Sequence, residues 1–247
     1  WLLKNRSDGL IRPCGWLDAW PPKVKAQAQI SIVTFIALKE LSQIFGYADR
    51  PLEKEYYYRE AILLSKRIKD VFFNPRNGLF AEHLFESGKV EGGETEDFWV
   101  HTQIWAALAG IAPDIRDLEA CRRYCLKNGM TVIPESSLET DYICDSTNGL
   151  EDLDLGSTAT WLLAVWPELT HLYAIAEIKY GRTSLALDAV CRQLPENVHY
   201  KNPYAPPYFY AEKYLYPYDI PWLCTWSGDP TLIQVLLEGF GGVHAIP

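Results

Sequence analysis

The sequence predicts an all-α fold in which consecutive helices pair as antiparallel hairpins arranged as a toroid. Apolar residues recur every three or four positions in several long segments, which is the period of one buried helix face. Glycines follow several of these segments, as is usual at helix ends, and long polar loops recur between them. About eight helices in four consecutive pairs are expected, with few segments typical of strands. No repeat of fixed period is evident, which argues against tetratricopeptide or HEAT arrays.

The first helical pair is expected at residues 23–45 and 54–73. Apolar residues of the first segment have the spacing of one buried helix face: Ile30, Val33, Ala37, Leu41 and Ile44. Gly46 is expected to end this helix as a left-handed cap. The second segment repeats the apolar pattern: Ala61, Leu64, Ile68 and Val71. The two segments therefore predict an antiparallel helical hairpin.

The middle of the chain combines a long polar stretch with a second pair of helices. Residues 74–98 are polar, contain glycines and are too long for a simple connection, so they are expected to form a loop that carries function. Segments 100–112 and 115–129 then predict two further helices, the second closed by Gly129. In such a toroid, the loop at residues 74–98 would lie on the same side as the other long loops.

The last part of the chain predicts a third pair and a final helix. Ser157 or Thr158 can cap a long helix that Gly181 would end. Its partner is expected at 183–194, and the final helix near 229–240. A closed toroid of six hairpins would need two more pairs, which would then precede the first residue.

Composition favours one globular domain over residues 1–247, since nearly half of the residues are hydrophobic. A formal net charge of −9 argues against binding to nucleic acid. No long apolar span or basic leader is visible, so neither membrane insertion nor a signal peptide is expected. Six scattered cysteines favour free thiols in a reducing, cytoplasmic compartment, and a homodimer is left open. Because the chain opens at Trp1 and its only methionine is Met130, we expect an N-terminal part to be missing.

Several segments, in chain order, resemble the catalytic domain of inverting glycoside phosphorylases of the cellobiose phosphorylase type. The segment "CGWLDAW" resembles that family's Gly-Asp-Trp-Asn-Asp-Gly, whose second aspartate, the general acid, falls on Asp18. The segment "FWVHTQIWAALAGIA" resembles Gln-x-Trp-Ala-x-x-x-Gly through Gln103, Trp105, Ala106 and Gly110. Three later segments resemble further family motifs: "ELTHLYAIAEIKYGR", "NPYAPPYFYAEKYLYP" and "WLCTWSGDPTLIQVLLEGFGGVHAIP". The resemblance implies an (α/α)6 barrel of the six-hairpin type, here its C-terminal four hairpins.

The family's phosphate-binding positions carry different residues here. The resemblance places Glu168 at a helix-start histidine, Glu212 at a glutamine, and Trp226 and Ser227 in a binding turn. Two carboxylates in one anion site oppose phosphate binding, whereas the same position suits a base that activates water. We therefore expect inverting hydrolysis, with Asp18 as general acid and Glu212, or secondly Glu168, as base across a gap of roughly 6.5 to 9.5 Å.

The expected partner is a carbohydrate, and the expected substrate class is a β-linked glucosidic oligosaccharide. The expected substrate-binding residues are aromatic side chains in loops and short polar groups: Trp16, Trp20, Trp99, Gln103, Tyr208, Trp226 and Ser227. Trp16 and Trp20 flank Asp18 and would raise its pKa by lowering the local polarity. No cofactor or metal is expected. Three acidic residues that could ligate Mg²⁺ or Ca²⁺ fit better as a solvated loop before the next helix: Glu151, Asp152 and Asp154.

Two other functions stay open at this point. The first is a true glycoside phosphorylase, which would require the phosphate site to lie in another register. The second is a sugar-binding protein that keeps the barrel without catalysis, in which case Asp18 would be a turn aspartate that caps a helix.

Overall fold

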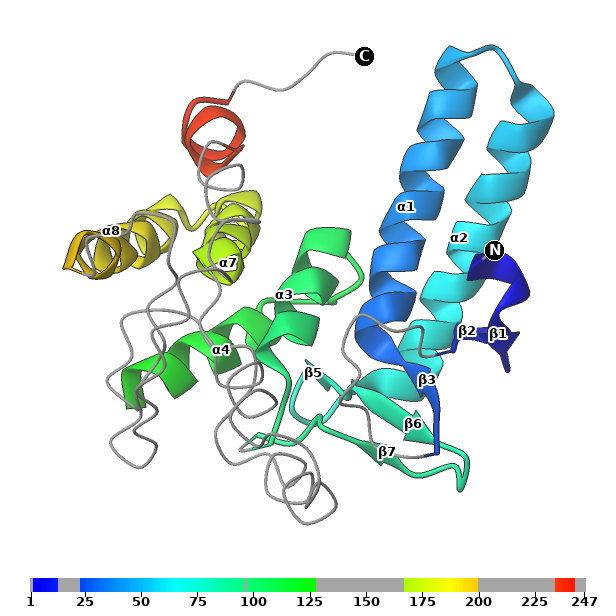
Figure 1. Cartoon of the computed structure of the whole chain (residues 1–247), viewed down its shortest axis with the longest axis horizontal. Helices are drawn as coiled ribbons and strands as arrows, with labels where there is room; N and C mark the ends of the chain where they lie inside the picture. The colour runs from blue at the N-terminus through cyan, green and yellow to red at the C-terminus, as the bar shows by residue number, and fades with distance from the viewer. Residues whose placement is uncertain (1, 13–22, 96, 128–166, 200–233, 243–247) are drawn as a thin grey trace. The chain divides into compact units, whose positions relative to one another are not determined.

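The computed structural model describes residues 2–12, 23–95, 97–127, 167–199 and 234–242 (Figure 1). The chain divides into two compact units. Unit 1 comprises Trp1–Asp114 and Pro247, and unit 2 comprises Ile115–Ile246. Both units are mainly helical in their described parts, as the sequence predicts. The closure of all hairpins into one barrel stays a prediction.

Unit 1 is built on the helical hairpin of α1 (Ala28–Tyr47) and α2 (Pro51–Phe72). The two helices lie side by side along their lengths, as expected (Figure 1). Asp49, with φ 53°, takes the left-handed conformation in the connecting turn. Pro51 begins α2 at a position where a helix has no use for a backbone N–H.

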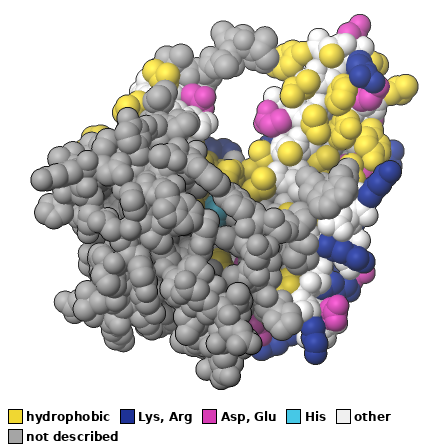
Figure 2. All heavy atoms as spheres, viewed as in Figure 1, with side chains coloured by type: hydrophobic (Ala, Val, Ile, Leu, Met, Phe, Trp, Pro, Cys, Tyr) yellow, Lys and Arg dark blue, Asp and Glu magenta, His cyan; other side chains and the backbone are white. Residues whose placement is uncertain are grey.

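The end of α1 and its buried face differ from the prediction. Gly46 lies inside the helix rather than capping it. The predicted apolar stripe is largely on the outside, since Val33 is 39% and Ile44 57% exposed; Figure 2 shows hydrophobic side chains gathered over this hairpin. The buried face holds instead a mixture of apolar residues and small polar ones: Ala28, Ser31, Ile32, Thr34, Phe35, Leu38 and Ser42.

Small hydroxyl residues can occupy the buried face of α1 because their hydrogen bonds are made. The Ser31 hydroxyl donates to the Gln27 carbonyl at 2.8 Å and accepts the Ile11 N–H at 3.2 Å. The Ser42 hydroxyl donates to the Lys54 carbonyl of α2 at 3.0 Å. By length and hydropathy α1 would also suit a membrane span, yet in unit 1 it packs against α2 and α3 and supplies part of the core.

The described residues include seven short antiparallel strands, whereas the sequence predicted few strands. None is longer than four residues, so an alternating pattern has no room to develop. They form three small sheets: β1 (Arg6–Ser7) with β2 (Leu10–Ile11); β3 (Val24–Gln27) with β6 (His83–Phe85) and β7 (Val90–Glu91); and β4 (Phe73–Asn74) with β5 (Leu79–Phe80). A 3-10 turn, η1 (Leu2–Lys4), precedes them. The stretch 74–98, expected to be a loop, thus supplies four of the seven strands wholly or in part.

Helix α3 (Val100–Ala109) completes unit 1 and packs against α1. It ends at Gly110, which has φ 69° and the left-handed conformation typical of a helix C-terminus. The core joins all three helices to the small strands, with its largest fully buried side chains including Leu10, Ile32, Leu64, Ile68, Phe72 and Phe80.

Unit 2 contains α4 (Arg116–Lys127), α7 (Pro167–Lys179), α8 (Thr183–His199) and the π-helical turn η3 (Val235–Phe240). Helix α7 packs against the other three elements. The predicted α7–α8 pair and the stop at Gly181, which has φ 76°, are confirmed. Small residues allow close packing in the core of this unit: Ala174, Ala186, Val190 and Val235.

Candidate functional site

Most of the residues predicted to form the site lie outside the described part of the chain: Trp16, Asp18, Trp20, Tyr208, Glu212, Trp226 and Ser227. The acidic loop residues Glu151, Asp152 and Asp154 also lie outside it. Glu168 is the second residue of α7. The roles of these residues stay predictions.

Gln103 and Trp99 are described, and both are buried in unit 1. The Gln103 side chain accepts the Phe80 N–H at 2.8 Å and donates to the Phe80 carbonyl at 2.8 Å, which fastens β5 to α3. Trp99 is 1% exposed and packs edge-on against the His83 ring, with centroids 5.5 Å apart. The side-chain amide of Gln103 is therefore already hydrogen-bonded to the backbone of Phe80. A substrate-binding role for Gln103 or Trp99 stays a prediction.

A buried polar cluster lies where β3 enters α1 and where α3 begins. We define the Glu82 cluster as Gln27, Gln29, Glu82, His101 and Thr102. The Glu82 backbone ties the region together, because its carbonyl accepts the Ala28 N–H at 2.8 Å and its N–H donates to the Glu91 carbonyl at 2.8 Å. The Glu82 side chain Oε2 accepts a hydrogen bond from the Thr102 hydroxyl.

Burial controls the protonation of Glu82, whose side chain is fully buried. Removal of the carboxyl from water raises its pKa to about 7. The Thr102 hydroxyl, the Gln27 side chain, His101 and the Gln29 backbone N–H oppose this rise without cancelling it. A carboxyl that titrates near neutral pH can donate or accept a proton, which is the property required of a general acid.

Hydrogen bonds within the Glu82 cluster are incomplete. Within the described part of the chain, Glu82 Oε1 and both polar atoms of the Gln27 side chain make no hydrogen bond of good geometry. The Gln27 side chain and the Gln29 backbone N–H nevertheless lie close enough to Glu82 to lower its pKa as hydrogen-bond donors. The half-buried Gln29 and His101 border these atoms and bond to each other, with 3.0 Å from Gln29 Nε2 to His101 Nδ1. Unsatisfied buried polar atoms are rare in native proteins and call for a structural or functional reason.

His83 and Gly92 lie directly beside Glu82, and Gly93 packs against Ala81. Burial lowers the pKa of His83 to about 3, so its ring is neutral near pH 7. Gly92, with φ 79°, approaches so closely that an added Cβ would lie 2.9 Å from Trp99 Cδ1 and 3.3 Å from Glu82 Cβ. The "GG" of the sequence is therefore needed for close packing at this point.

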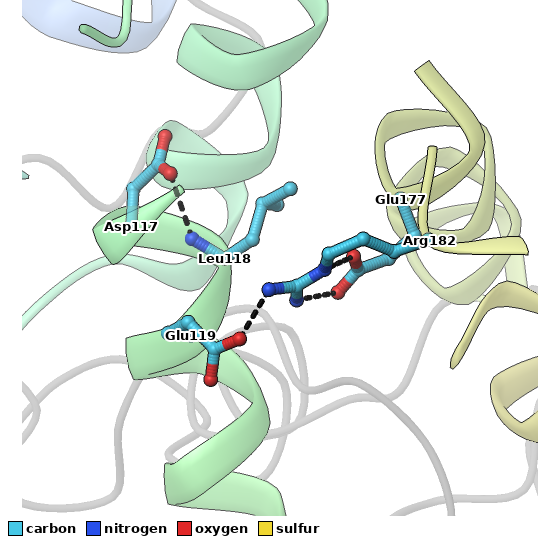
Figure 3. Close-up of polar contacts among 5 residues, drawn as sticks. All are labelled: Asp117, Leu118, Glu119, Glu177 and Arg182. Carbon is cyan, nitrogen blue, oxygen red and sulfur yellow. Dashed lines mark hydrogen bonds and ion pairs between the residues drawn. The ribbon is translucent and has the colours of Figure 1, made fainter. Parts of the chain in front are cut away.

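Unit 2 holds a second polar cluster, centred on Arg182 (Figure 3). The Arg182 guanidinium donates to both oxygens of the fully buried Glu177, at 2.5 and 2.7 Å, and also to Glu119 of α4. Nearby, the carboxylate of Asp117 accepts the Leu118 N–H at 2.8 Å. These contacts fasten the C-terminal end of α7 to α4. Glu177 and Arg182, which belong to the segment "ELTHLYAIAEIKYGR", therefore have a structural role.

Only a weak signal for the Glu82 cluster is present in the sequence. Glu82 lies in the apolar run "LFAEHLF", where a single acidic residue at a buried position could have been noticed. Its partners come from two other segments, residues 27–29 and 101–102. No grouping of three or more His, Cys, Asp or Glu suited to a metal occurs among the residues that the structure describes.

Comparisons with known proteins show a likeness of fold. No family model matches the chain. No curated protein matches it either. Among solved structures, a GH78 family rhamnosidase of Bacillus sp. GL1 aligns with a TM-score of 0.53 and 19% identity. The alignment covers 81% of this chain and 18% of that one, so this chain spans about a fifth of the length of its neighbour. The likeness supports a fold of the kind found in that glycoside hydrolase and does not single out the cellobiose phosphorylase family.

Proposed function

We propose that this chain is catalytic and hydrolyses a glycosidic bond. The observation that supports the proposal most is the likeness of fold, over 81% of the chain, to a GH78 family rhamnosidase. The segment "CGWLDAW" adds a carboxyl flanked by two tryptophans. Within the described residues, the Glu82 cluster adds a buried polar region whose carboxyl keeps its proton below about pH 7, and such a region suits a neutral, hydroxyl-rich ligand.

The proposed reaction is inverting hydrolysis. Asp18 protonates the oxygen of the leaving group, and Glu212 removes a proton from the water that attacks the opposite face of the sugar. Glu168 is the second choice for the base. The bond between the anomeric carbon and the leaving oxygen breaks as the bond to water forms, and the sugar is released with inverted configuration.

The test measures hydrolysis of p-nitrophenyl rhamnoside and p-nitrophenyl β-glucoside, each with and without inorganic phosphate. The first sugar follows the name of the structural neighbour, and the second follows the motif resemblance. We expect release of p-nitrophenol without phosphate, and proton NMR should show the inverted anomer first. Release only with phosphate, as a sugar 1-phosphate, would instead identify a phosphorylase.

The role of Asp18 is tested by Asp18→Asn. Loss of the general acid should lower kcat by about 100-fold or more, and less on substrates whose leaving group needs little protonation. Asp8→Asn is the control, because Asp8 is an exposed aspartate that pairs with Lys25. Equal turnover by Asp18→Asn and the unmodified chain on every cleaved glycoside would remove Asp18 as the acid.

A further inference from the structure

We propose that Glu82 and Gln27 form a binding site for adjacent hydroxyl groups of an uncharged sugar, at the N-terminal ends of α1 and α3. The proposal rests on the proposed function, since it names residues by which such an enzyme would hold its substrate. It assigns the site to residues other than Trp99 and Gln103, whose polar and aromatic groups are engaged in packing unit 1.

The first argument is the number of unpartnered atoms that meet at one place. Glu82 and Gln27 have no exposed surface, and Glu82 Oε1, Gln27 Oε1 and Gln27 Nε2 make no hydrogen bond of good geometry within the described residues, although the Gln27 side chain lies close enough to Glu82 to act on its pKa. A buried polar atom without a partner costs about 1–3 kcal/mol of stability. Three such atoms on two adjacent side chains call for an explanation, and a ligand that supplies well-placed hydrogen-bond partners would provide one.

The second argument is chemical complementarity. A neutral carboxyl group both donates and accepts a hydrogen bond, and so does a carboxamide. Each hydroxyl group of a sugar does the same, so a pair of adjacent hydroxyls can satisfy both side chains. A carboxyl group disfavours an anionic ligand, and Ca²⁺ prefers a shell of several carboxylates and carbonyls. An uncharged polyol therefore fits the atoms better than an ion.

The third argument is the surroundings of the two side chains. Gln29 and His101, both half-buried, form the nearby border, and their mutual hydrogen bond of 3.0 Å is one that a ligand could exchange for its own. The His101 ring lies 6.0 Å from the ring of Trp105, whose Nε1 is buried and also without a hydrogen bond among the described residues. Polar groups and an aromatic ring together are what a sugar site requires.

The experiment measures sugar binding by the full chain. The probes are rhamnose, glucose and monodeoxy analogues of whichever sugar binds, followed by ligand-observed NMR. Glu82→Leu and Gln27→Leu remove the hydrogen-bonding atoms, whereas Glu82→Gln keeps a donor and an acceptor. Glu86→Leu, at an exposed position of the same segment, is the control. Hydrogen exchange of α1 and α3 shows whether each variant is folded.

We expect Glu82→Leu and Gln27→Leu to weaken binding by about tenfold or more, and Glu82→Gln by less. The deoxy sugar that lacks the recognised hydroxyl should bind the unmodified chain more weakly, but should bind Glu82→Leu as the parent sugar does. If Glu82→Leu fails to fold, Gln27→Leu and the deoxy series decide. Unchanged affinity in folded Glu82→Leu and Gln27→Leu overturns the site, as does failure of both sugars to bind the unmodified chain.

The two proposals fail in different ways. Sugar binding that depends on Glu82, without hydrolysis of either p-nitrophenyl glycoside, overturns the proposed function and leaves the site standing. Hydrolysis with a KM that is the same in the unmodified chain and in Glu82→Leu overturns the site and leaves the function standing. Stabilisation by Ca²⁺ that is lost in Glu82→Leu, in place of sugar binding, overturns the assignment to a polyol.

Discussion

Replacement of Glu82 by glutamine should change how the stability of unit 1 depends on pH. Burial raises the pKa of Glu82 from 4.5 to about 7 in the folded chain. Below pH 4.5 the carboxyl is protonated whether or not the chain is folded. Between pH 4.5 and about 7 the unfolded chain releases the proton while the folded chain retains it, so stability falls as the pH rises. Above pH 7 both forms are ionised and the loss is complete.

The size of the effect follows from the two pKa values. Each pH unit between them corresponds to about 1.4 kcal/mol, so the folded chain should lose about 3 kcal/mol from pH 4.5 to above pH 7. Glu82→Gln resembles the protonated acid at every pH and has no such loss. Relative to the unmodified chain, the variant should therefore gain about 3 kcal/mol between pH 4 and pH 8.

The assay compares urea unfolding of both chains from pH 4 to pH 8, with hydrogen exchange of α1 and α3 as the local readout. The readout is the difference in unfolding free energy between the two chains at each pH, because His83 changes the stability of both chains in the opposite direction. Its pKa is lowered to about 3, so charging it costs stability as the pH falls below 6.5, in both chains alike. Glu86→Gln, an exposed substitution, controls for the loss of one charge. A difference that is flat with pH, or that favours the unmodified chain at pH 8, would refute the reasoning.

Three further substitutions test the packing, each by urea unfolding. Gly93→Ala should destabilise unit 1 by about 1–3 kcal/mol, because its Cβ would lie 2.7 Å from the backbone of Ala81. Gly88→Ala is the control: a Cβ there meets nothing within 4 Å, so only the strain of the positive φ should cost stability. Equal losses of stability in the two variants would contradict the steric argument. Arg182→Met should lower the unfolding free energy of unit 2 by about 3 kcal/mol, because it leaves the buried Glu177 without its partner. Adding Glu177→Gln to this variant should restore part of the lost stability. If the effects of the two substitutions simply add, the pair is not coupled. Ile68→Ala, at a fully buried position of α2, should cost about 2–5 kcal/mol, whereas Ile62→Ala, 51% exposed on the same helix, should cost less than about 1 kcal/mol.

The hairpin of α1 and α2 shows how far periodic patterns reach. The spacing of Ala61, Leu64 and Ile68 predicted the buried face of α2, and these three residues are buried. The same reasoning chose the wrong face of α1, since that helix carries two apolar stripes. The choice between them depends on which stripe meets α2 and α3, and on Ser31 and Ser42 finding buried hydrogen-bond partners.

The candidate site shows the limit more clearly. The motif around Asp18 directed attention to one carboxyl, whereas the carboxyl that the structure describes as buried and shifted in pKa is Glu82. A pKa depends on the loss of water and on neighbouring groups, and the neighbours of Glu82 come from β3, the start of α1 and α3. The spacing of residues along the chain does not show which groups from distant segments lie next to Glu82.

The sequence by itself determined the approximate positions of the long helices, because helical periodicity acts over a few residues, and it placed the stop at Gly181 correctly. The tertiary structure alone decided which face of α1 is buried, that short strands replace the expected loop at 74–98, and that Glu82 and Gln27 meet. These features depend on contacts between segments far apart in sequence, where burial and unsatisfied hydrogen bonds are properties of the assembled unit and not of any one segment.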